Sequence, residues 1–112
     1  TTGDKNTIAG GLAGDALTEG DNNTVFGYNA LSGETLGDRN IAIGVNALST
    51  QNNTSDTDVY NIGVGYNAGS SITTGVRNTL IGGLVADSLT TGQYNTAVGY
   101  QVLASEELVM IL

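Results

Sequence analysis

The chain repeats itself with a period of 17 residues, and this repeat limits the folds that it can adopt. One Asn recurs in six copies, and the steps between consecutive copies are 17, 17, 21, 17 and 17 residues. The longer step is a single four-residue insertion. The six copies are Asn6, Asn23, Asn40, Asn61, Asn78 and Asn95. A unit this short buries its apolar side chains only by stacking on its neighbours, which is typical of solenoid proteins.

Glycine occupies two fixed positions in the repeat. Three residues before the Asn stands a Gly in five copies, and Asp58 takes that place after the insertion. Glycine adopts positive φ at corners where a Cβ would clash, and stacked Asn side chains can hydrogen-bond one another. We therefore predict that the Asn and Gly columns are architectural. Four residues after the Asn stands a Gly in every copy: Gly10, Gly27, Gly44, Gly65, Gly82 and Gly99.

The residues from each Asn to the following Gly are rich in β-branched side chains, which predicts a strand of about four or five residues. A second, weaker extended segment is predicted after the Ala-Leu step at 30–31 and 47–48. Each unit is then one coil of an all-β protein, a parallel β-solenoid or β-roll of six repeats. We expect the array to cover residues 1–104, with the insertion near 49–58. Residues 105–112 are expected to form a C-terminal cap or the start of a stalk.

Both faces of the predicted strand carry apolar or small side chains. The residue two after the Asn lies on one face and the residue three after it on the other, as Val25 and Phe26 do. A strand with one face in water alternates apolar and polar side chains instead. A lone solenoid with one such coil per repeat would leave one apolar face wet. We therefore expect chains to pack around a shared axis, as an intertwined or side-by-side homotrimer.

Composition excludes several classes of function. A chain of 112 residues forms one domain. The absence of Cys and His removes disulfides, thiol nucleophiles, the usual zinc sites and the imidazole base of most hydrolytic triads. With 3 Lys and Arg against 11 Asp and Glu, few cations are left for a phosphate backbone. The longest apolar run, 108–112, is too short to span a bilayer. We expect no cofactor, no nucleic acid and no membrane insertion, and a chain cut from a longer protein because it lacks a starting Met.

The repeats resemble those of a known class of fibrous proteins. The segments 23–31 and 95–103 and the turn at 90–92 read NTVFGYNAL, NTAVGYQVL and TTG. They are similar to the TTGxxNTAxGxxAL repeats of bacteriophage tail fibres and related bacterial surface proteins, and to the left-handed parallel β-roll heads of trimeric autotransporter adhesins. The resemblance covers about residues 3–104. It implies a trimeric fibre segment on a virion or a bacterial cell surface, which supports attachment to a glycan or a protein of the host surface.

Two columns with aromatic side chains are the candidate ligand contacts. Large-small alternation for packing explains them, and a ladder of rings on which a saccharide stacks is the functional alternative. Five residues after the Asn, alternate copies carry Tyr28, Tyr66 and Tyr100. In the column just before the Asn, the even copies carry Asn22, Tyr60 and Tyr94. The odd copies carry all three cations there: Lys5, Arg39 and Arg77.

Carboxylates form a third column, two residues before the Asn, at Asp4, Asp21 and Asp38. Their copies would stand about one strand spacing apart, where like charges repel. Lys5 and Arg39 lie between them and would relieve this repulsion. A bound divalent cation is the alternative interpretation.

The polar insertion is a candidate recognition loop, because binding residues often lie on loops that a rigid repeat scaffold projects. It is equally explained as a tolerated surface excursion. Its Asp56 and Asp58 are a candidate calcium element, although they lack the spacing and the Gly of an EF-hand loop.

Two other functions are weaker alternatives. Asp56 and Asp58 are the only acid-base pair conceivable for cleavage of a glycosidic bond, and in a loop they have no supporting shell, so we expect a protein without enzymatic activity. A monomeric solenoid could instead bind an ordered surface such as ice through one column of hydroxyls, which Ile41 and Ile62 interrupt. That column consists of Thr7, Thr24, Thr79 and Thr96.

Overall fold

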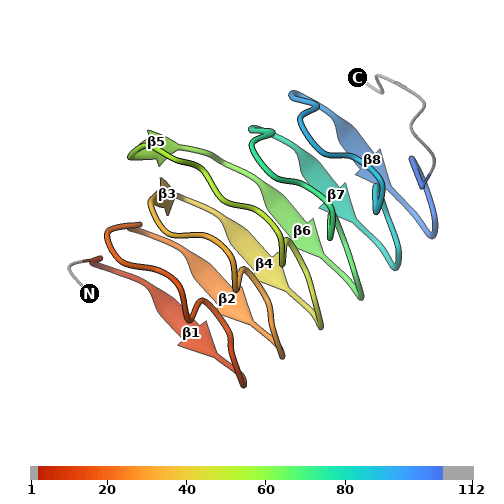
Figure 1. Cartoon of the computed structure of the whole chain (residues 1–112). Coiled ribbons are helices and arrows are strands. Elements are labelled where there is room, and N and C mark those ends of the chain that lie inside the picture. Colours follow the sequence, from red (N-terminus) through yellow and green to blue (C-terminus); the bar gives the residue numbers. More distant parts are fainter. Residues whose placement is uncertain (1–2, 105–112) are drawn as a thin grey trace.

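The structure is a computed structural model that describes residues 3–104. The chain winds into a stack of coils, and each coil adds one short strand to a parallel sheet (Figure 1). The described residues contain no helix, and hence none that could cross a membrane. The predicted all-β parallel solenoid is confirmed, with strands of three residues instead of four or five. The strands lie in the order β1 (Thr7–Ala9), β2 (Thr24–Phe26), β4 (Ile41–Ile43), β6 (Ile62–Val64), β7 (Thr79–Ile81) and β8 (Thr96–Val98).

The register of the sheet follows the repeat. The residue after each repeat Asn pairs with its counterpart in the next coil, so Thr7 lies beside Thr24 and Thr24 beside Ile41. The same register continues past the insertion, where Ile41 pairs with Ile62. A slip by one residue would turn every inward side chain outward. The alternation of core and surface side chains therefore holds the coils in this register.

The core lies inside the coil and is built by a single chain. The residue two after the repeat Asn points inward, and Val25, Ala42 and Leu80 are completely buried there. Leu31 and Leu48 join the same cluster from the turns that follow the strands. Burying one such side chain is worth about 1.5–3 kcal/mol. One face of the strands from β2 to β8 is therefore covered without a partner chain, whereas the inner Ile8 of β1, at the end of the stack, is 41% exposed.

The Ala-Leu step is a corner, and the turn continues through residues 32–33 and 49–50, where the extended segment was predicted to begin. Leu31 and Leu48 have φ of 50° and 52°, in the left-handed region. The N–H of Leu31 donates to the carbonyl of Ala47 in the next coil at 2.9 Å. The corner aims both Leu side chains into the core, and this burial offsets a backbone cost of about 1–2 kcal/mol per residue.

Glycine is required in the two columns for different physical reasons. Gly27 has a φ of 129°, and a Cβ there would stand 2.7 Å from the carbonyl oxygen of Gly44 in the next coil. Gly20, from the column before the Asn, has no positive φ, but its Cβ would stand 2.5 Å from the carbonyl oxygen of Gly37. Close stacking of the coils excludes a side chain in both columns, and an unusual backbone conformation is needed only in the column after the strand, at Gly27 and its copies.

The insertion rejoins the stack one residue earlier than the sequence alignment suggests. A short second sheet pairs β3 (Gly37–Asp38) with β5 (Thr57–Asp58), so Asp58 lies beside Asp38 and Thr57 beside Gly37. Asp58 therefore continues the carboxylate column and does not replace a Gly. An extra residue between Asp58 and Asn61 restores the common register. The expected cap or stalk at 105–112 lies outside the described residues.

Candidate functional site

The repeat Asn side chains form a buried ladder through the stack. The Oδ1 of Asn23 accepts the backbone N–H of Asn40 at 2.8 Å, and the Nδ2 of Asn23 donates to the carbonyl of Gly37 at 3.0 Å. Asn61 makes the same two kinds of bond, to the N–H of Asn78 at 2.9 Å and to the carbonyl of Gly75 at 2.7 Å. Buried backbone groups need such partners. Each Asn supplies them where the strands have not yet begun.

The outward side of the sheet is apolar and exposed. We define the outer face as the residues one and three after each repeat Asn, and it contains no charged side chain. Phe26, Ile43 and Ile81 each expose about two fifths of their surface on it, and Val98 exposes 63%. A contiguous apolar surface of this kind typically marks an interaction site. The outer face consists of Thr7, Ala9, Thr24, Phe26, Ile41, Ile43, Ile62, Val64, Thr79, Ile81, Thr96 and Val98.

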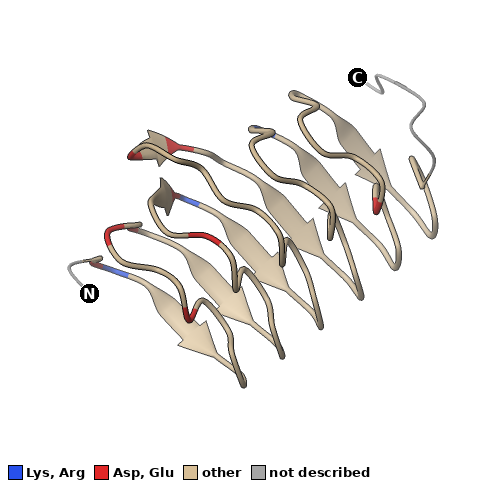
Figure 2. Cartoon of the chain, in the orientation of Figure 1, with Lys and Arg blue, Asp and Glu red and all other residues tan. Residues whose placement is uncertain are grey.

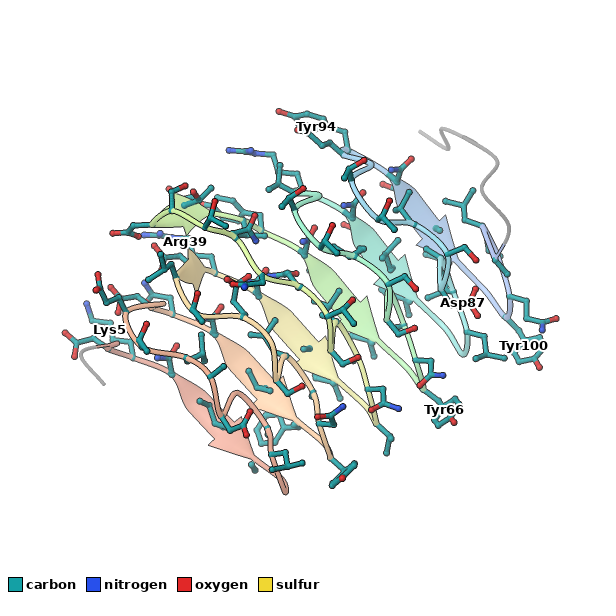
Figure 3. The ribbon with its side chains drawn as sticks, in the orientation of Figure 1. Lys5, Arg39, Tyr66, Asp87, Tyr94 and Tyr100 are labelled. Atoms are coloured by element: carbon teal, nitrogen blue, oxygen red, sulfur yellow. The ribbon has the colours of Figure 1, made fainter. Side chains whose placement is uncertain are left out.

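The two aromatic columns lie on opposite edges of the roll. Figure 3 shows Tyr66 and Tyr100 projecting from one edge and Tyr94 from the other, with Arg39 and Lys5. The structure therefore does not bring all the candidate tyrosines together into one site. A ligand of ordinary size would contact one edge or the other.

The edge after the strands shows the large-small alternation. Tyr28, Tyr66 and Tyr100 are exposed. A Cβ added to Gly11 would stand 3.3 Å from the ring of Tyr28, and one added to Gly83 would stand 3.4 Å from the ring of Tyr100. The small residue in the odd coil thus makes room for the ring of the next coil, which is a packing role.

The edge before the strands stacks cations between aromatic rings. The guanidinium of Arg39 lies 6.0 Å from the ring centre of Tyr60, and that of Arg77 lies 5.9 Å from the rings of both Tyr60 and Tyr94. These distances allow cation-π attraction. Every residue of the column has a left-handed φ between 57° and 61°. We call this column the Arg-Tyr edge: Lys5, Asn22, Arg39, Tyr60, Arg77 and Tyr94.

The carboxylate column forms a hydrogen-bonded ladder beside the Arg-Tyr edge. The backbone N–H of Asp4 donates to the Oδ1 of Asp21 at 2.5 Å, and that of Asp21 donates to the Oδ1 of Asp38 at 2.7 Å. Arg39 pairs with Asp58 and lies 3.8 Å from Asp38. Figure 2 shows the cations at the edge where the strands begin. Backbone donors and Arg39 thus compensate the stacked charge, whereas within residues 3–104 no ion pair joins Lys5 to a carboxylate.

The insertion folds back onto this ladder. The pKa of Asp38 is raised chiefly by burial and further by the neighbouring Asp56 and Asp21 carboxylates, against the lowering effect of the hydrogen bond from the Asp21 backbone N–H. Asp56 and Asp58 themselves are exposed. In the part of the chain that the structure describes, no three acidic side chains converge in a group that could hold a metal ion.

A buried acid is the largest feature that sequence reasoning missed. Glu34 is fully buried and has no cation beside it. Its Oε1 accepts the backbone N–H groups of residues 35, 36, 37 and 53 at 3.0–3.3 Å. Its Oε2 accepts the side-chain amides of Gln51 at 2.6 Å and Asn53 at 2.9 Å. Six donors converge on one carboxylate, and together they fix the start of the insertion.

The sequence repeat contains an irregularity that marks the position of the Glu34 hydrogen-bond network. Eleven residues after the repeat Asn, the first, fourth and fifth copies carry Leu17, Ile72 and Leu89, whereas Glu34 and Gln51 interrupt this apolar column next to the insertion. Gln51 also accepts the Nδ2 of Asn61 at 2.8 Å, which ties the network to the Asn ladder.

No family model, curated protein or solved structure matches this chain.

Proposed function

We propose that this chain is a rigid segment of a trimeric fibre, in which three copies pack side by side through their outer faces. The single observation that carries the proposal is the exposed apolar outer face, which spans all six strands beside a core that each chain closes for itself. Area of this kind is worth about 25 cal/mol per Å² when removed from water.

The side-by-side arrangement follows from where the core lies. Val25, Ala42 and Leu80 are buried within one chain, so strands need not be exchanged between copies. The outer face then lies toward the shared axis, and both edges with Tyr side chains lie at its borders. The resemblance of the repeats to tail-fibre and adhesin repeats supports the same arrangement, on a virion or a bacterial cell surface.

The function proposed for such a segment is structural and adhesive. The stack holds surface side chains at a regular spacing, and the protein supports attachment to a glycan or a protein of the host surface. We propose no enzymatic activity and no nucleic-acid partner, because the chain has no His or Cys and a formal net charge of −8.

Sedimentation equilibrium of the whole chain tests this proposal. A trimer of 11.4 kDa chains has a mass of about 34 kDa, three times the chain mass. The double variant Ile43→Lys, Ile81→Lys places two charges on the outer face and is expected to sediment as an 11.4 kDa monomer with an unchanged circular dichroism spectrum. Asn52→Lys, in the exposed insertion, is the matched control and is expected to stay trimeric. A wild-type monomer at all concentrations would rule the proposal out.

A monomeric solenoid that binds an ordered surface such as ice is the second candidate. The observation in its favour is the in-register pairing of Thr7 with Thr24 and of Thr79 with Thr96 on the outer face. A monomer that shows thermal hysteresis would favour this candidate over the fibre.

A further inference from the structure

The carboxylate ladder stops two coils before the Arg-Tyr edge does. Asp4, Asp21, Asp38 and Asp58 follow one another through the first four coils. In the next two coils the equivalent residues are Val76 and Gln93. The C-terminal part of the edge therefore has a cation, Arg77, where the column supplies no carboxylate.

The missing carboxylate leaves a backbone donor without its partner. In the first coils the N–H of Asp4 and the N–H of Asp21 each donate to a carboxylate from the following coil, at 2.5 and 2.7 Å. The equivalent donor in the fifth coil is the N–H of Val76. Since the following coil offers Gln93 in place of an Asp, this N–H has no hydrogen-bond acceptor within residues 3–104.

Arg77 is left equally without a counter-ion. Arg39 pairs with Asp58 and Asp38, but no carboxylate of the described residues lies within ion-pair distance of Arg77. The rings of Tyr60 and Tyr94 flank its guanidinium at 5.9 Å each. A guanidinium held between two rings keeps its N–H groups for a planar anion such as a carboxylate.

The backbone gives an independent reason to regard these side chains as selected for contact. Tyr60, Arg77 and Tyr94 have φ of 57°, 58° and 60°, a region that suits Asn or Gly and disfavours bulky side chains. Asn22 occupies the same position in the second coil. Tyr60 and Tyr94 are nevertheless 48% and 62% exposed, so core packing does not account for them.

We propose that the N–H of Val76 and the guanidinium of Arg77 bind the carboxylate of an acidic sugar, with the exposed ring of Tyr94 against the sugar ring. The inference rests on the proposed function only in taking a surface glycan as the target. A ring with apolar C–H faces and hydroxyl edges matches the ring of Tyr94, which has an apolar body and a polar tip. A single carboxylate is also tolerated by a chain of net charge −8, which repels polyanions.

The test is an NMR titration of the whole chain, in which the amide signal of Val76 is followed. Methyl glucuronide is the probe, methyl glucoside is the same ring without the carboxylate, and acetate is the carboxylate without the ring. We expect the glucuronide to bind in the millimolar range and about tenfold or more tightly than either control. If acetate bound as tightly as the glucuronide, the sugar would be refuted as the ligand, in favour of an acidic peptide. If the Val76 signal did not move, binding at this site would be refuted.

Two variants and a matched control separate binding from folding. Gln93→Asp supplies the missing carboxylate from within the ladder, so it should abolish glucuronide binding without lowering the thermal midpoint. Arg77→Gln should weaken binding about tenfold or more, whereas Arg39→Gln, at a cation already paired with Asp58, should change it less than about twofold. Glucuronide binding by Gln93→Asp at the wild-type affinity would contradict the proposal.

The sedimentation experiment keeps this inference separate from the fibre. A trimer that fails to bind the glucuronide refutes the sugar site and leaves the fibre standing. A monomer that binds it refutes the fibre and leaves the site standing.

Discussion

Glu34 concentrates more hydrogen bonds than any other described side chain, and it does so without a cation. Six donors point at its two oxygens, and an ionised carboxylate is a pure acceptor that suits all of them. A buried anion is costly unless its hydrogen bonds are complete. Glu34 therefore fixes the conformation of the chain at the point where the insertion leaves the stack.

Glu34→Gln is expected to lower the free energy of unfolding by about 2–3 kcal/mol. The new amide N–H₂ would face the donors of Gln51 and Asn53, and buried donors would lose their acceptor. Urea denaturation followed by circular dichroism measures the change. Glu19→Gln, at an exposed acid, is the control and should stay within about 0.5 kcal/mol of wild type. Equal effects of the two substitutions would contradict the role of Glu34.

Asp38 makes the stability of the stack depend on pH. Its pKa is raised above the ordinary value of 3.8, chiefly by burial, so the folded state binds the proton more tightly than the unfolded state. The stability it contributes is fully present below pH 3.8 and is lost as the pH rises through the pKa of the folded state. Asp56, Asp21, Asp58 and Arg39 surround it.

Asp38→Asn is expected to remove this dependence. The free energy of unfolding of wild type relative to the variant should rise as the pH falls from 7 through the raised pKa of Asp38, because only wild type takes up that proton. Denaturation curves at a series of pH values measure the difference. Parallel pH profiles for the two proteins would show that Asp38 does not titrate as its burial implies.

At the scale of the coil, the glycine after each strand allows neighbouring coils to stack closely. Gly27→Ala is expected to lower the free energy of unfolding by about 3 kcal/mol. The alanine would have to adopt a φ of 129°, and its Cβ would stand 2.7 Å from the carbonyl oxygen of Gly44. Gly83→Ala is the comparison, since its Cβ meets only the ring of Tyr100 at 3.4 Å, and it should cost less than about 1 kcal/mol. A thermal midpoint that falls equally in both variants would refute this account of the corner.

The sequence predicted the coil better than its corners. Regular spacing of Asn and Gly is enough to define the parallel register, because both residues act by stacking on their own copies. The left-handed corner at Leu31 and Leu48 was missed because Leu normally avoids that conformation, and only tertiary burial offsets its cost. The insertion was misaligned by one residue because an Asp in a Gly column does not reveal an extra residue downstream.

The candidate site, too, could be predicted from the sequence only in part. The sequence alternation of Arg and Tyr was visible, but their stacking required coordinates, because only coordinates show that Arg77 lies between two rings and lacks the carboxylates that Arg39 has. The Glu34 network was visible as an interruption of an apolar column, yet its six donors come from backbone groups and amides on both sides of the insertion. Residue types alone do not place such donors.

At the scale of the whole molecule, one chain buries its core by itself but leaves an apolar surface exposed. The inner residues of the strands are fully buried from β2 to β8, whereas the outer face exposes apolar side chains over all six strands. We therefore expect the outer face to serve assembly and the C-terminal end of the Arg-Tyr edge, at Arg77 and Tyr94, to serve recognition.

Burial of the outer face between copies is the central claim, and one thiol-labelling measurement tests it most directly. The chain has no Cys, so Ile43→Cys and Asn52→Cys each introduce a single thiol, on the outer face and in the exposed insertion. At concentrations where the chains are assembled, the thiol of Ile43→Cys should react about tenfold or more slowly than that of Asn52→Cys, and dilution should remove the difference. Equal labelling rates at every concentration would show that the outer face stays open to water, and the account of a side-by-side fibre would be wrong.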